Sequence, residues 1–313
     1  MELIRTDEMI LIWKAMKPPL DPEDIVRLAV GPERYKEKPG KEPVFNDWQA
    51  ILSEIIVGDA FGVDRMDYLL RDSHHAGVVY GRFGHIRLID TLRILARPGG
   101  DPDEPTEPML GVEEGGLHSA EALLLARYFM FSQVYCHPVR RIYDIHLKDF
   151  LRAWLPNGTL PTEVEAHLAM TDNGVYAALL ESHRNASAAG HDPARRIVKR
   201  DHFKLLWRRN PNDRKLHHDP AAVLFAAAQE EFGADRVRRD SYTQGGGSPD
   251  FPVRCSDERV VSSLELSDTL SKLPTVKADY IFITPDRRSK AKKWLNSNRD
   301  NILKKAKKVE GQE

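Results

Sequence analysis

The chain has 313 residues, of which 41% are hydrophobic and 30% are charged, and its formal net charge is -1. This composition is that of a folded globular protein, and the balanced charge does not single out nucleic acid or any other charged partner. The two cysteines, Cys136 and Cys255, are far apart, which argues against a disulfide framework and fits a reducing compartment. With no long apolar run and no export signal at the first residues, we expect a cytoplasmic protein without membrane contact.

Hydrophobic periodicity predicts a mainly helical chain up to about residue 190. Asp21-Pro22 has the chemistry of a helix start, because Asp caps a helix and Pro suits its first turn. Polar loops are expected over 34–43 and 97–107, and a short strand over 108–112. The predicted helices, in chain order, cover 5–16, the segment after Asp21, 45–57, 63–78, 84–93, 117–154 (two helices, or one bent at Pro138) and two short helices within 160–185.

From about residue 190 the pattern changes. Strand-like segments at 203–207, 251–254, 260–266 and 280–284 surround a helix at 221–232 and a glycine-rich loop at 245–249. We therefore predict a helical domain over 1–190, a small α+β subdomain over 191–285 and a basic helical tail over 286–313. Residues 287–308 contain ten Lys and Arg against one acid. Such a helix can bind nucleic acid, although a solvated helix face is the favoured interpretation.

The most informative segment is the predicted helix at 63–78, which mixes apolar with charged residues. Asp64, Tyr68 and Asp72 are four residues apart, so they share one helix face. Charges on an apolar helix are costly unless they are paired or bind a ligand. The segment therefore predicts either a salt-bridge network or one wall of a polar-ligand site. For Asp64 alone, a helix cap is the competing interpretation.

Two sequence blocks resemble one enzyme family. Residues 63–73, Val-Asp-Arg-Met-Asp-Tyr-Leu-Leu-Arg-Asp-Ser, resemble a motif of HD-superfamily phosphohydrolases, in the branch that contains dGTPase-like and sterile-alpha-motif-HD enzymes. Residues 125–131 and 134–137, Leu-Ala-Arg-Tyr-Phe-Met-Phe and Val-Tyr-Cys-His, resemble the family's Arg and Tyr-x-His in the same order. The resemblance covers about residues 1–190. It implies an HD-like helical fold, hydrolysis of a deoxynucleoside triphosphate (dNTP) to release triphosphate, and a divalent metal (Mn, Fe, Mg or Zn).

The resemblance also implies a role for each matching residue. Asp64 corresponds to the last metal ligand and is the catalytic candidate. The implied substrate contacts are Arg65 and Arg127 to phosphate, Tyr68 to phosphate and sugar, Asp72 to the sugar 3′-hydroxyl group, and Tyr135 and His137 to sugar and base. Arginine suits such a site because its guanidinium group binds phosphate in bidentate fashion. For Arg127 the competing interpretation is a structural ion pair with Glu121 or Asp144.

The metal pattern of the family is incomplete in this sequence. The family's first His and its His-Asp pair precede the last Asp, whereas no histidine precedes His74 here. The dipeptides His191-Asp192 and His218-Asp219 are each followed by Pro, which predicts that each Asp caps a helix and is not a metal ligand. One carboxylate does not hold a catalytic transition metal, which needs about three protein ligands.

We therefore expect the chain to carry the substrate-side half of a phosphohydrolase site, as a truncated or split enzyme that is inactive by itself. A homo-oligomer, or a partner chain that supplies the missing helices, is the expected assembly. The alternative is a non-catalytic nucleotide-binding or scaffold module that has lost its metal centre.

Overall fold

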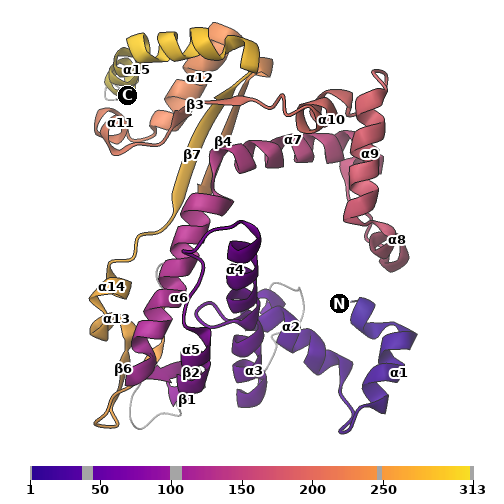
Figure 1. Ribbon diagram of the computed structural model, residues 1–313, viewed down its shortest axis with the longest axis vertical. Helices are drawn as coiled ribbons and strands as arrows, with labels where there is room; N and C mark the ends of the chain where they lie inside the picture. Colours follow the sequence, from indigo (N-terminus) through magenta and orange to yellow (C-terminus); the bar gives the residue numbers. More distant parts are fainter. Residues whose placement is uncertain (1, 37–44, 99–107, 245–248, 311–313) are drawn as a thin grey trace. The chain divides into compact units, whose positions relative to one another are not determined.

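The computed structural model describes residues 2–36, 45–98, 108–244 and 249–310, and shows a mainly helical protein with two small sheets (Figure 1). This fold class is the one that the sequence predicted. The chain packs into two compact units: Met1–Phe131 with Gly245–Thr275, and Ser132–Gln244 with Val276–Glu313. The domain boundaries expected near residues 190 and 285 stay a prediction.

The helices of the first unit follow the predicted pattern closely. Asp21 accepts a hydrogen bond from the backbone N–H of Glu23 at 2.9 Å, as expected for a helix start. Asn46 and Gln49 form a reciprocal capping box at the start of the next helix. The helices of this unit are α1 (Asp7–Ala15), α2 (Pro22–Lys36), α3 (Asp47–Val57), α4 (Val63–His75), α5 (His85–Thr91), α6 (Leu117–Met130), α13 (Ser263–Leu266) and α14 (Asp268–Ser271).

A four-stranded sheet completes the first unit, in the order β1 (Leu92–Ala96), β2 (Pro108–Glu113), β5 (Pro252–Arg254) and β6 (Val260–Ser262). Only the β2–β5 pair is parallel. The prediction of a helix up to residue 93 was wrong at its end, because Leu92 and Arg93 pair with β2. The prediction of a strand over 260–266 was wrong after Ser262, whose hydroxyl group caps α13 by accepting from Leu264 N–H at 3.1 Å.

The second unit contains a three-stranded antiparallel sheet with β7 (Lys277–Ile283) between β3 (Lys204–Arg208) and β4 (Val237–Thr243). A π-helical turn, Phe131–Tyr135, separates α6 from α7, and Pro138 occupies the first turn of α7, which confirms the predicted break. The helices of this unit are α7 (Pro138–Trp154), α8 (Val164–Ala169), α9 (Asp172–Arg184), α10 (His191–Val198), α11 (Pro211–Leu216), α12 (Pro220–Phe232) and α15 (Arg288–Glu310).

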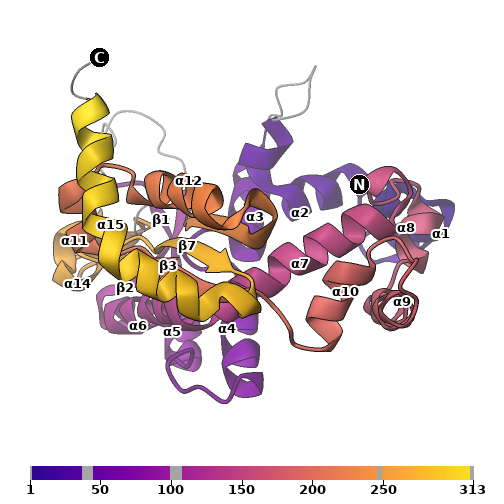
Figure 2. The ribbon, with the colours of Figure 1, turned by 90° about the horizontal axis from the view of Figure 1, so that it is seen from above.

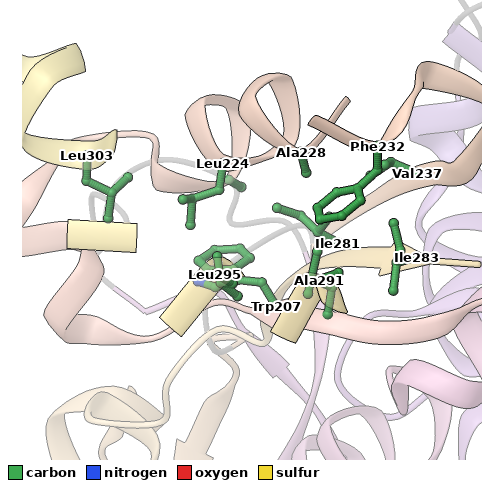
Figure 3. Packing of buried hydrophobic residues seen from close by; sticks show 12 residues of the cluster. Trp207, Leu224, Ala228, Phe232, Val237, Ile281, Ile283, Ala291, Leu295 and Leu303 are labelled. Atoms are coloured by element: carbon green, nitrogen blue, oxygen red, sulfur yellow. The ribbon is translucent and has the colours of Figure 1, made fainter. Parts of the chain in front are cut away.

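The core of the second unit lies where α12 and α15 pack beside the sheet. Leu224 and Phe232 of α12 meet Ile281 of β7 and Leu295 of α15 in one buried cluster (Figure 3). Figure 2 shows α12 and α15 near each other over this sheet. The basic segment is therefore a helix with an apolar face in the core, and its lysines from Lys290 to Lys307 lie on the opposite, exposed face.

The two His-Asp dipeptides have different local roles. The helix α10 begins at His191 with Gly190 as its N-cap, so the predicted capping role of Asp192 was wrong. Asp192 instead forms ion pairs with Arg195 and Arg196 of the same helix. The predicted cap at Asp219 is confirmed, because its carboxylate accepts from the backbone N–H of Ala222 at 3.1 Å.

Several predicted loops fall on residues that the structure does not describe. Residues 37–43 of the first polar loop, 99–107 of the second and 245–248 of the glycine-rich loop lie outside the described ranges. In the described part of the chain, no helix combines the length and the apolar character needed to cross a membrane.

Leu224→Ala should destabilise the second unit, because it leaves a cavity at a side chain that is 1% exposed. We expect the free energy of unfolding to fall by about 2–5 kcal/mol. The matched control is Leu180→Ala in the same unit, where the side chain is 45% exposed and the loss should be about 1 kcal/mol or less. Denaturant unfolding of both variants measures the difference, and equal losses would contradict this packing.

His146 predicts a specific pH dependence of stability. Burial, with a smaller contribution from Arg196, lowers the pKa of this imidazole from 6.5 to about 4. The backbone N–H of Phe203 donates to its Nε2 atom at 3.3 Å, which requires a neutral ring. Because the unfolded chain then binds more protons between pH 6.5 and 4, stability falls as the pH drops through this window.

We expect the wild-type chain to lose about 3 kcal/mol from this group on going from pH 7 to pH 4. His146→Gln removes the titration, so the difference in unfolding free energy between wild type and variant should shrink by that amount. Urea unfolding at several pH values gives this difference. An identical pH slope in both proteins would contradict the assignment.

Candidate functional site

The predicted site helix, α4, is anchored by one apolar face and presents its polar face outward. Met66, Leu69 and Ser73 are buried, and Leu69 is fully so. Gly81 lets α4 approach α6, because a Cβ atom there would lie 2.5 Å from the Ser73 side chain and 2.9 Å from Met130 Sδ. The position of α4 beside α6 is therefore set by apolar packing, and the charged residues follow from it.

The structure brings Arg65 of α4 and Arg127 of α6 together on one acid, Asp59. Arg65 Nη1 donates to the carboxylate and to the backbone oxygen of Asp59. Arg127 Nη1 donates to the same backbone oxygen at 3.1 Å, and its Nη2 to the same carboxylate oxygen, Oδ1, at 3.4 Å. Two cations separated by 62 positions in the sequence thus share one anion. We call Arg65, Arg127 and Asp59 the arginine clamp.

Arg127 is the more enclosed of the two arginines. Its side chain is 12% exposed, compared with 21% for Arg65 and 55% for Asp59. Its Nε atom is buried and has no hydrogen-bond partner in the described chain. The ring of Phe131 lies 6.0 Å from its guanidinium carbon. A buried guanidinium N–H without an acceptor is costly, so this atom is the unsatisfied polar group of the clamp.

Tyr68 lies in the electrostatic field of the clamp. Burial raises the pKa of its phenol above the ordinary value, while the positive charges of Arg127 and Arg65 act in the opposite direction. Asp64 and Asp72 also act on this phenol, in the direction of burial. Five of the predicted site residues therefore form one neighbourhood in the first unit: Asp64, Arg65, Tyr68, Asp72 and Arg127.

Asp64 lies in the first turn of α4 but is not its cap, which is Gly62. Its exposed carboxylate accepts from the backbone N–H of Arg65 at 2.7 Å. Among the described residues, no group of three or more His, Cys, Asp or Glu side chains is arranged to hold a metal ion. The donors described here therefore do not fit a complete metal centre, although the HD association of the chain implies a metal.

Tyr135 and His137 belong to the second unit, so their predicted contacts with sugar and base stay predictions. His137 has a local role as the N-cap of α7, where Nδ1 accepts from the backbone N–H of Val139 at 3.3 Å. The carbonyl oxygen of Tyr135 accepts from Arg140 at 2.6 Å. Both residues thus lie at the junction between the π-helical turn and α7.

Sequence reasoning missed Asp59 and proposed the wrong partners for Arg127. Glu121 instead contacts His118 and Ser267, and Asp144 pairs with Arg140 and Arg141. The sequence contains only a weak signal for a role of Asp59, which is its place after Gly58, five residues before Asp64. Nothing in the local pattern links that turn to Arg127, which is 68 positions further on.

Comparisons with known proteins relate part of the sequence and the fold to known families. Residues 87–218 match the family described as HD associated region, so the chain is associated with the HD superfamily. A phosphohydrolase from Bacteroides thetaiotaomicron has a similar fold, with a TM-score of 0.54 and 20% identity over 77% of this chain and 64% of that one. At that identity the similarity shows the fold alone.

The chain belongs to the same family as a hypothetical protein from Aquifex aeolicus of known structure. The two share 30% identity with a TM-score of 0.74, over 94% of this chain and 70% of that one. The uncharacterized proteins YwfO of Bacillus subtilis and MJ1154 of Methanocaldococcus jannaschii are 34% and 39% identical over 96 and 95 residues. These matches cover 31% and 30% of this chain, but only 20% and 19% of the relatives' lengths.

The clamp geometry predicts a change in the titration of Tyr68. Arg127→Gln removes the cation with the largest effect on this phenol, so its pKa should rise further. The control is Arg82→Gln, because Arg82 is exposed and is not among the groups that act on Tyr68. NMR titration of labelled tyrosine measures both. Equal shifts in the two variants would place Arg127 away from Tyr68.

Proposed function

We propose that the chain supplies the phosphate- and sugar-binding side of a nucleotide phosphohydrolase site, with a dNTP as the substrate. The observation that carries the proposal is the arginine clamp with its buried, unpartnered Arg127 Nε atom. Two guanidinium groups directed at one point match the oxygen arrangement of a polyphosphate. The association with the HD superfamily supports the same reaction class.

The neighbouring residues suit the rest of a nucleotide. The phenol of Tyr68, held near both arginines, offers a flat apolar face and a hydroxyl group. Asp72 is one helical turn beyond Tyr68 and offers a carboxylate to a sugar hydroxyl group. We assign these roles by their place in the α4 face. Tyr135 and His137 remain the proposed contacts to sugar and base.

Asp64 is the proposed contribution of this chain to the metal centre. A bound divalent metal would polarise a phosphoryl oxygen and activate water. The described residues do not form a ligand group that would hold it, and we propose that further ligands come from another copy or from a partner chain. The same finding supports the second candidate function, a nucleotide-binding module without hydrolytic activity.

Arg127→Gln should weaken dNTP binding by roughly tenfold or more, because it removes charge-assisted hydrogen bonds to phosphate. Isothermal titration calorimetry with the full chain measures the dissociation constant. Arg82→Gln removes an equal charge from an exposed site and should leave the affinity unchanged.

The same samples are also analysed for free triphosphate. Binding with release of triphosphate supports the phosphohydrolase, whereas binding without release is expected both of the module and of the substrate-side half of a phosphohydrolase site. Equal affinities in wild type and Arg127→Gln would remove the phosphate role of the clamp.

A further inference from the structure

The carboxylate of Asp59 occupies the position where a phosphate oxygen would be held. Its Oδ1 atom and its backbone oxygen accept all of the clamp hydrogen bonds described above, from Arg65 Nη1 and from Arg127 Nη1 and Nη2. A pair of oxygens facing two guanidinium groups is the same arrangement that a bound phosphate presents. An anion that enters this site must therefore compete with Asp59.

Asp59 is also the member of the clamp that is best placed to move. It lies in the turn between α3 and α4, and its side chain is 55% exposed, whereas both arginines are largely covered. It lines a pocket of about 240 Å³ together with Phe61, Leu110 and Phe251. The pocket gives the side chain a direction in which to leave. Because both arginines are largely covered, they would lose their anion if the carboxylate moved alone, so it leaves as an incoming anion takes its place.

Other acids oppose that movement. Glu54 and Asp250 line the same pocket, and each is held in place. Glu54 accepts from the backbone N–H of Leu110 at 2.7 Å, and Asp250 accepts from the hydroxyl groups of Ser262 and Ser263 at 2.8–2.9 Å. A carboxylate that turns toward these acids meets like charge, so the clamp contact is favoured until a stronger anion arrives.

We infer that Asp59 is an internal competitor for anions at the clamp, which lowers the affinity of the two arginines for every phosphate species. This inference rests on the proposed function. The two arginines carry two positive charges and Asp59 neutralises one of them. Any phosphate species that binds both arginines displaces the carboxylate, so Asp59 weakens the apparent affinity for each species by the same factor.

The test compares binding of inorganic phosphate, pyrophosphate and tripolyphosphate to the full chain and to Asp59→Asn. Asp59→Asn should tighten the binding of each species by a similar factor of roughly tenfold, because it removes the competitor. Asp67→Asn is the matched control, because Asp67 is an exposed acid on α4 that pairs with Arg71. It removes the same charge without touching the clamp and should leave all three affinities unchanged.

Three results would overturn the inference, and they are distinguishable. If wild type binds tripolyphosphate and Asp59→Asn binds it with the same affinity, Asp59 does not compete, while the proposed function stands. If the substitution weakens binding of every anion, Asp59 positions the arginines instead. If neither protein binds any phosphate species, the proposed function fails as well. Thermal unfolding checks that the variants are folded, and Asp59→Ser serves as a second neutral variant that should behave like Asp59→Asn.

Discussion

Contact between two guanidinium groups and a single carboxylate joins α4, α6 and the turn before α4 in the first unit. This contact depends on apolar packing, because the two helices approach each other through buried Leu69 and Met130, with Gly81 in the narrow space beside them. A larger residue at 81 would push against Ser73 and Met130. The buried side chains of α4 are therefore not charged, and its charged side chains lie on the other face of the helix. The fold thus holds these polar groups near its surface without burying unpaired charge.

The arginines are favourable in this position only because they have an anion to bind. Arg127 is nearly enclosed, and its guanidinium group would be costly there without a partner. Asp59 supplies that partner, yet one buried N–H of Arg127 has no acceptor among the described residues. The same contact therefore stabilises the fold at the position where we propose that phosphate binds. This links the stability of the unit to its proposed chemistry.

The second unit shows a different use of charge. The pair between Arg141 and Asp240 joins α7 to β4 with two hydrogen bonds of 2.6–2.7 Å. Both side chains are largely buried, and this partner holds the pKa of the Arg141 guanidinium above its ordinary value. The basic helix α15 is held by apolar contacts instead, because Leu295 and Leu303 are buried in the core of the unit. Its exposed lysines from Lys290 to Lys307 therefore project from a helix whose position in the unit is fixed.

The sequence by itself determined most helices and the position of the site helix, because apolar spacing and capping residues act within a few positions of one another. It also indicated Asp64, Tyr68 and Asp72 as one face, since a helix has a fixed period. It did not reveal β1 and β4, whose extended form depends on pairing with β2 and β7. Only the tertiary structure decided that Asp59 would meet Arg65 and Arg127. That contact joins a turn to a helix far along the chain. Local sequence patterns do not predict it, because these side chains meet only when the helices pack together.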